Sequence, residues 1–237
     1  MKYGLFLYLC PKILIMSKKI LSFSVFSFFA LFCIYGQDDA YSQKIIDDMV
    51  AKFKTYSSVS LNFSANITLQ DRSETEQEGT IWLKNNKYKL EISDDVIYYD
   101  GSKIYHYMPK VKEVTINKPD PEDDSEDFQL LNPSSYFNLS SKSFKSKLIK
   151  ESTQDNRKVY EIDLYPVQIK NANYTRIRIM IEKSTLQMVY LKAILNDGTH
   201  YTLSFKPYNK PQPVLRDSFF TFNIIEHPGV EVIDLTF

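Results

Sequence analysis

The sequence is poor in cysteine, glycine and histidine, and neither sign of charge is in excess. Both cysteines, Cys10 and Cys33, lie within the first 36 residues, so a chain without that leader has no disulfide, thiol nucleophile or cysteine metal ligand. The balance of 29 basic and 29 acidic residues is not the charge pattern of a nucleic-acid-binding protein. The leader has four lysines and no acid, which leaves 25 bases and 29 acids after residue 36. We expect no nucleic-acid partner.

The motifs of common enzyme and metal sites are also missing. His106, His200 and His227 are isolated from one another and from other metal ligands. There is no Gly-x-Ser-x-Gly elbow, phosphate-binding glycine loop or dinucleotide motif. The acidic run 120–127 lacks the spacing of a calcium loop and indicates a solvated loop. We therefore predict a protein that is not an enzyme and has neither a metal nor a cofactor; an esterase is the enzymatic alternative.

The first 36 residues have the organisation of a secretory signal peptide. Lys18 and Lys19 precede an apolar stretch, 20–34, that is short for a membrane span. Met16 is a candidate start, and cleavage after Gly36 would leave 37–237 as a single exported domain in the periplasm. An uncleaved anchor and a lipid-modified Cys33 are the alternatives.

One amphipathic helix opens the remaining chain. Tyr41, Ile45, Met49, Phe53 and Tyr56 recur every three or four residues, which places them on one helical face. Asp38 and Asp39 suit the helix N-terminus. The period then changes to two over 59–70, where six apolar residues alternate with six polar ones, which predicts a half-buried strand.

Further strands follow, joined by turn residues such as Asn85-Asn86 and Asp100-Gly101. Asn132-Pro133 begins a short helical insertion that runs to Leu139. The remaining strands are predicted at 79–84, 87–92, 96–99, 103–108, 111–116, 145–151, 158–165, 174–182, 188–195, 201–206, 219–222 and 231–235. The fold class is mainly β with a helical part (α+β): one curved antiparallel sheet of about eleven strands, an N-terminal helix and a short helical insertion.

The sequence has more aromatic and apolar residues than one helix can cover against such a sheet, with 17 Tyr, 16 Phe and one Trp. Either the sheet encloses an apolar concavity of the kind that binds lipids or small molecules, or these residues fill a solid barrel core. A structural or adhesive β-domain is the function that a solid core would favour.

Several segments, in order, resemble the periplasmic outer-membrane lipoprotein carrier (LolA) family. They are Ser57-Ser-Val-Ser-Leu-Asn-Phe, Glu78-Gly-Thr-Ile-Trp-Leu-Lys, Tyr88-Lys-Leu-Glu, Asp100-Gly-Ser-Lys-Ile-Tyr-His-Tyr-Met-Pro and Phe220-Thr-Phe followed by Pro228-Gly-Val-Glu-Val-Ile-Asp. The resemblance implies an unclosed antiparallel barrel whose helices form a lid over a cavity for the acyl chains of lipoproteins. It also implies a monomeric carrier between inner and outer membrane, with acylated lipoproteins, an inner-membrane ABC lipoprotein exporter and an outer-membrane acceptor as candidate partners.

On this reading the strands and the helices supply different parts of the site. The cavity residues are predicted to be Leu61, Phe63, Ile67, Trp82, Tyr88, Leu90, Ile179, Ile181 and Phe205, and the lid residues Ile45, Met49, Phe53, Leu131 and Phe137. The family usually has Arg-Pro after the tryptophan-containing strand, where the arginine holds the lid. This chain has Lys84-Asn85-Asn86, so Lys84 and Asn85 are the candidate lid latch.

The alternative function is a periplasmic regulatory module that senses lipids or lipoproteins, as in proteins similar to the sigma-factor regulator RseB. Such regulators carry a second domain, and this chain ends at Phe237, soon after its last predicted strand. We therefore favour the carrier over the regulator.

Overall fold

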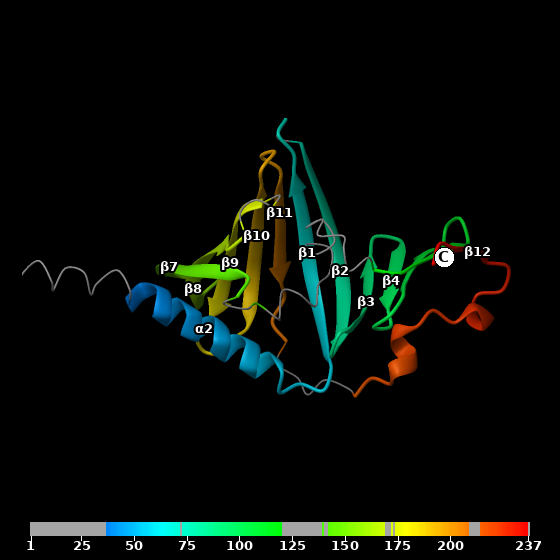
Figure 1. Ribbon diagram of the computed structural model, residues 1–237, viewed down its shortest axis with the longest axis horizontal. Helices are drawn as coiled ribbons and strands as arrows, with labels where there is room; N and C mark the ends of the chain where they lie inside the picture. Colours follow the sequence, from blue (N-terminus) through cyan, green and yellow to red (C-terminus); the bar gives the residue numbers. More distant parts are fainter. Residues whose placement is uncertain are drawn as a thin grey trace, which may run out of the picture.

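The computed structural model describes residues 37–71, 73–119, 139, 142–168, 172, 174–208 and 214–236 (Figure 1). The leader 1–36 and most of the predicted insertion 133–139 lie outside the described residues. The chain forms helix α2, Gln37–Phe53, then a sheet of twelve strands, with two short 3-10 helices before the last strand. This confirms a mainly β fold with one N-terminal helix.

The strands follow the chain in two antiparallel series. The bounds are β1 Val59–Thr68, β2 Glu74–Lys84, β3 Lys87–Ile92, β4 Asp95–Tyr99, β5 Ile104–Met108, β6 Glu113–Asn117, β7 Phe144–Gln154, β8 Arg157–Pro166, β9 Tyr174–Glu182, β10 Met188–Leu195, β11 His200–Phe205 and β12 Glu231–Asp234. Their order in space is β12-β6-β5-β4-β3-β2-β1-β11-β10-β9-β8-β7. The described strands leave β12 and β7 at opposite edges, so the barrel is unclosed, as predicted.

Local turn chemistry explains most of the hairpins. Asn85, Asp155 and Asn156 adopt positive φ angles of 54°, 47° and 60°, and Gly101 and Gly198 adopt 96° and 85°. Asparagine, aspartate and glycine tolerate this left-handed conformation, which tight hairpins require. The predicted turns at 85–86 and 100–101 therefore join β2 to β3 and β4 to β5.

The C-terminal segment departs from the predicted pattern. Residues 219–222 form no strand, because the 3-10 helix η3, Asp217–Phe220, occupies the place, and η4, Ile224–Glu226, follows. The last strand, β12, pairs with β6 in parallel, so the sheet is not wholly antiparallel. The predicted antiparallel sheet assumes short hairpins between strands. A long connection precedes β12, and a long connection allows parallel pairing.

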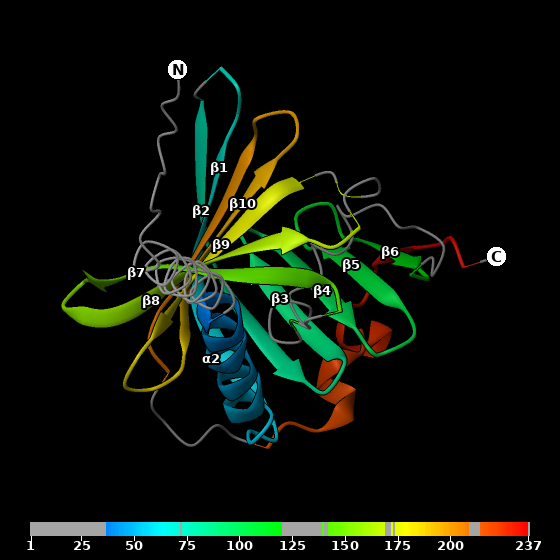
Figure 2. The same ribbon diagram turned by 60° about the vertical axis from the view of Figure 1, so that its left-hand side comes forward.

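The register assigns each side chain to one face of the curved sheet. Directly paired residues share a face, so Val59, Leu61 and Phe63 lie with Leu83, Ile81 and Gly79 on the face that we call inner. Helix α2 packs on this inner face along β7 (Figures 1 and 2). Its N-terminal half is held there by a bond between the Ser42 and Ser146 hydroxyls, 2.8 Å apart.

The two halves of the sheet are covered on opposite faces. On the inner face, apolar residues of α2 join those of β1 and β8–β10 in one buried cluster. On the outer face of β2–β6, residues 214–236 pack through aromatic contacts: Phe219 on Trp82 at 5.6 Å, and Phe222 on Tyr98 at 6.0 Å and Tyr107 at 5.1 Å between ring centroids. Phe220 and Val114 are fully buried.

Candidate functional site

The inner face is the candidate site, and its helix-covered part is a packed core. Most of the predicted cavity residues lie there: Leu61, Phe63, Tyr88, Ile179, Ile181 and Phe205 are buried. Among the predicted lid residues, Ile45 and Met49 belong to the same buried cluster, and Phe53 is half-buried against it. The structure thus brings the two sets together, and in this state α2 fills the space above these strands.

Beyond this core, the inner face carries apolar side chains that are only half-buried. We call this set the half-buried inner surface: Ala65, Ile67, Leu90, Ile92, Ile97, Tyr99, Tyr201 and Leu203. Of these, the sequence predicted only Leu90 and Ile67. The cross-strand register supplies the others, since Leu90 pairs with Ile97 and Ile67 with Tyr201. A half-exposed apolar surface on the inside of a curved sheet can take up an apolar ligand.

A glycine shapes the middle of this face. Gly79 stands opposite Phe63, and a Cβ at position 79 would lie 2.5 Å from the Phe63 ring and 2.6 Å from the Glu91 carbonyl oxygen. The absence of a side chain lets the Phe63 ring lie over β2. The inner face is therefore continuous in apolar character from β11 across to β3.

The inner face becomes polar towards β5. His106 is paired with Ile97, and its Nε2 lies 3.0 Å from an Asp95 carboxylate oxygen. Thr115 stands opposite His106 on β6. The surface thus changes from apolar at Leu90 to hydrogen-bonding at His106, a gradient that suits an amphiphilic ligand.

The prediction that Trp82 lines the cavity is wrong, because Trp82 does not share a face with Leu61. The register pairs Trp82 with Ser60 and Lys89 on the outer face. The Lys89 ammonium lies 5.3 Å from the centroids of Trp82 and Tyr98 and 5.1 Å from that of Phe219. Burial, followed by the charge of Glu91, raises the pKa of Tyr98 to about 12. Trp82 therefore belongs to the layer that holds the C-terminal segment.

The candidate lid latch also lies on the outer face. Lys84 Nζ donates to the Leu215 carbonyl and to an Asp217 carboxylate oxygen, each at 2.7 Å, and Lys87 Nζ reaches the other oxygen at 2.8 Å. Asn85 is an exposed turn residue. In the described part of the chain, Lys84 therefore holds segment 214–217 and not α2.

Two predicted lid residues, Leu131 and Phe137, lie outside the described residues. Among the residues that are described, no three His, Cys, Asp or Glu side chains are grouped as a metal site would need. Within those same ranges, no helix has the length and apolar character to cross a membrane.

Comparison with known proteins identifies a family. The profile of a family described as outer membrane lipoprotein carrier protein LolA matches residues 54–223. No curated protein matches the chain.

Several solved structures are similar in fold at low sequence identity. A putative outer membrane lipoprotein-sorting protein domain from Vibrio parahaemolyticus is 11% identical, with a TM-score of 0.47 over 79% of this chain and 99% of that one. Lipoprotein LppX from Mycobacterium tuberculosis is 12% identical, with a TM-score of 0.48 over 74% and 99%. A chain of the MucA/MucB complex of Pseudomonas aeruginosa is 10% identical, with a TM-score of 0.32 over 67% of this chain and 55% of that one.

Proposed function

Because the chain belongs to the LolA family of outer membrane lipoprotein carrier proteins, we propose that it carries lipoproteins by binding their acyl chains on the inner face of its sheet. The observation that carries this proposal is the half-buried inner surface. These side chains are apolar, lie on the concave side and remain partly open next to a helix that already packs on the same face.

Energetics support a carrier that releases its cargo. Burial of a methylene group contributes about 0.8 kcal/mol, so ten buried methylenes would contribute about 8 kcal/mol. Full enclosure of a long acyl chain would make release slow. In this structure α2 occupies the inner face above Leu61 and Ile179, next to the half-buried inner surface, so an acyl chain that extends beyond that surface must compete with the helix for the neighbouring apolar side chains. That competition lowers the net affinity and favours handover.

The proposed cellular setting follows from the family. We propose an exported monomer, residues 37–237, that acts in the periplasm, receives acylated lipoproteins from an inner-membrane ABC exporter and delivers them to an acceptor at the outer membrane. The lid would consist of α2 and the segment that contains Leu131 and Phe137. The chemistry proposed for the site is binding alone, without catalysis.

The first test is native mass spectrometry of the protein purified from its own cell envelope. We expect a co-purifying acylated ligand. If the purified protein carries no ligand and also fails to bind a fluorescent fatty acid, the proposal is contradicted and a solid core is favoured.

A matched pair of variants locates the ligand. Ile97 lies on the inner face and Ile194 on the outer face, and both are half-buried in strands. Ile97→Glu places a carboxylate where the acyl chain would bind, so we expect at least about a tenfold loss of fatty-acid affinity, equivalent to about 1.4 kcal/mol. Ile194→Glu should leave that affinity unchanged. Equal losses of fatty-acid affinity in the two variants would show that the acyl chain does not bind on the inner face.

A further inference from the structure

The outer face of β7–β10 carries charged side chains in cross-strand rows. The register places Lys147 opposite Asp163, Asp163 opposite Arg178, and Arg178 opposite Lys192. Neighbouring strands lie about 4.8 Å apart, so these four side chains form one row across four strands. The row lies on the face opposite to α2.

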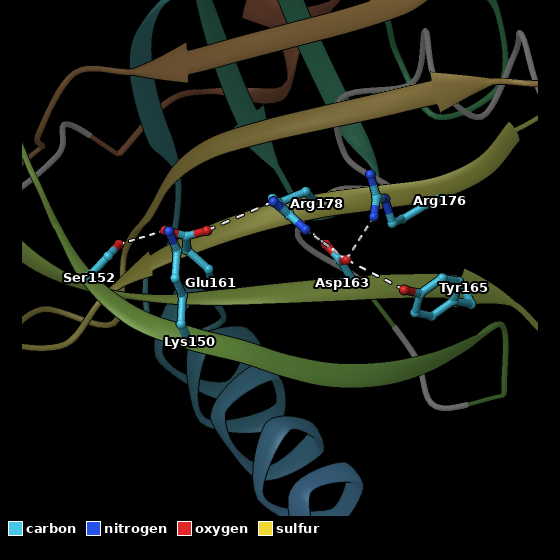
Figure 3. A network of polar contacts seen from close by, with 7 residues as sticks. All are labelled: Lys150, Ser152, Glu161, Asp163, Tyr165, Arg176 and Arg178. Carbon is cyan, nitrogen blue, oxygen red and sulfur yellow. Dashed lines mark hydrogen bonds and ion pairs between the residues drawn. The ribbon is translucent and has the colours of Figure 1, made fainter. Parts of the chain in front are cut away.

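The first acid of this face is buried and fully paired. Asp163 is 1% exposed and accepts hydrogen bonds from Arg178 Nε at 2.7 Å and Nη2 at 2.9 Å (Figure 3). Arg176 Nη1 donates to it at 3.3 Å and the Tyr165 hydroxyl at 3.4 Å. The hydrogen bond to Asp163 raises the pKa of Arg178 above its ordinary value. Asp163 is therefore neutralised within the protein and hidden from solvent.

The second acid, Glu161, is hidden in the same way. Its side chain is 7% exposed and accepts a hydrogen bond from the Ser152 hydroxyl at 2.7 Å. Lys150 Nζ lies 3.4 Å from one of its oxygens and Arg178 Nη1 4.0 Å from the other (Figure 3). Both carboxylates thus stand beneath basic groups that reach the surface.

The surface charge that remains is positive. Against two buried acids, the face presents six bases, which we call the basic face: Lys145, Lys147, Lys150, Arg176, Arg178 and Lys192. Lys145, Lys147 and Lys192 form no ion pair with the described residues. The next acid on this side, Glu182, lies at the end of β9 and accepts hydrogen bonds from Ser184 and Thr185 in the turn that follows.

The positive charge of the basic face affects the pKa of a neighbouring histidine, His200. Burial lowers the pKa of His200, and the charges of Lys192 and Arg176 lower it further. The chain after residue 36 has more acids than bases. The basic face is therefore opposite in sign to the body that carries it, so an anionic surface would orient the molecule.

Apolar side chains lie among these bases. Ile149 in the bulge of β7 is 38% exposed, Tyr165 at the end of β8 is 37% exposed, and Val167 just after it is 43% exposed. Exposed lysines with an aromatic ring and aliphatic groups beside them match the headgroup region of a bilayer, where charge and apolar groups are both accommodated.

We propose that the basic face of β7–β10 docks the protein on anionic phospholipid membranes. This inference goes beyond acyl-chain binding: the docking surface lies on the outer face and the acyl-binding surface on the inner face, so either can fail without the other. A membrane fits better than an acidic protein because the unpaired charges are flexible lysines, which bind diffuse anionic charge without fixed geometry.

The test is co-sedimentation of the full chain with vesicles of phosphatidylglycerol mixed with phosphatidylcholine. Each lysine near an anionic surface contributes about 1 kcal/mol, about a fivefold change in affinity. Combining Lys145→Gln, Lys147→Gln and Lys192→Gln should weaken binding about 100-fold, and Lys147→Gln alone about fivefold. Because these lysines form no ion pair with the described residues, we expect both variants to fold.

The matched control combines Lys52→Gln, Lys54→Gln and Lys112→Gln, which removes the same charge from exposed positions elsewhere. The control should bind vesicles as the unmodified protein does, and binding should fall as salt shortens the Debye length below about 10 Å. Equal weakening by control and test variants would overturn the proposal. So would failure to bind vesicles together with binding of poly-glutamate, which would assign the face to an acidic protein partner. Fatty-acid displacement on the same samples reports separately on the inner face.

Discussion

The two halves of the sheet differ in which face is covered by other parts of the chain. In the β7–β10 half, α2 covers the inner face, and the outer face protects its buried carboxylates with its own arginines and lysines. In the β2–β6 half, residues 214–236 cover the outer face and the inner face stays half-open. The cover therefore changes sides near the middle of the sheet, and the change leaves an apolar surface on the inner face of one half and a basic surface on the outer face of the other half.

The largest expected effect on stability comes from removing the buried carboxylate of Asp163 from the outer face of the β7–β10 half. Asp163→Ala would remove a carboxylate that is 1% exposed, together with the hydrogen bonds that it accepts from Arg178, Arg176 and Tyr165, at a cost of about 3–5 kcal/mol in the free energy of unfolding. Chemical denaturation measures this cost. The control is Glu78→Ala, since the Glu78 side chain is 71% exposed and its carboxylate lies 3.1 Å from Lys206 Nζ, and it should change stability by less than about 1 kcal/mol. Similar costs in the two variants would mean that the Asp163 cluster is not a structural requirement.

A smaller effect is expected where the cover changes sides. Gly79→Ala would press a methyl group against the Phe63 ring and the Glu91 carbonyl, at a cost of about 1–3 kcal/mol. In a Phe63→Leu background, Gly79→Ala should cost less than it does in the unmodified protein, because the ring is gone. Part of the cost should remain, because the Glu91 carbonyl belongs to the backbone. An unchanged denaturation midpoint for Gly79→Ala would show that β1 and β2 are not packed this closely.

The smallest effect concerns the attachment of the C-terminal cover. Hydrogen bonds from Lys84 and Lys87 lower the pKa of Asp217 to about 2. Because this lies below the unfolded value of about 3.9, the ion pairs stabilise the attached segment above about pH 4 and are lost as the pH falls towards 2. Trp82, the single tryptophan, packs on Phe219 and should report detachment by a red shift of its fluorescence over that range.

Two variants separate this titration from general acid unfolding. Asp217→Asn should abolish the Trp82 transition between pH 4 and 2. Asp234→Asn alters a carboxylate whose pKa is also lowered, but by hydrogen bonds from Thr236 at the far end of the same segment, so the transition should persist. A transition that survives Asp217→Asn would mean that other groups hold the segment.

Much of the sheet could be predicted because its signals are local. The strict alternation of 59–70 gave β1, and Asn85-Asn86 and Asp100-Gly101 gave two hairpins, since each pattern depends on a few consecutive residues. The burial of Leu61, Ile179 and Ile45 also agrees with the periodicities of their segments, while their roles in a cavity or a lid stay predictions. The unclosed order of strands agrees with the resemblance of short segments to the carrier family.

The misplaced features all depend on contacts between distant segments. Strand parity predicts an inward Trp82, but the partner that covers its ring on the outer face, Phe219, lies far along the chain. Residues 219–222 are mostly aromatic and favour a short strand, but the Phe219 and Phe222 rings pack on the face of an existing sheet. Lys84 was compared with a lid arginine, and its partners proved to be Leu215 and Asp217. Composition and spacing do not specify which of two faces such a segment covers.

The free edges of the sheet have a consequence for solubility. An unclosed sheet offers unpaired backbone groups on which strands of other molecules could grow into fibres. At one edge, β7 has a bulge between Leu148 and Lys150 and carries outward lysines; at the other, β12 is only four residues long. Both features discourage strand addition, so we expect the edges that the described residues form not to join copies of the chain at high concentration.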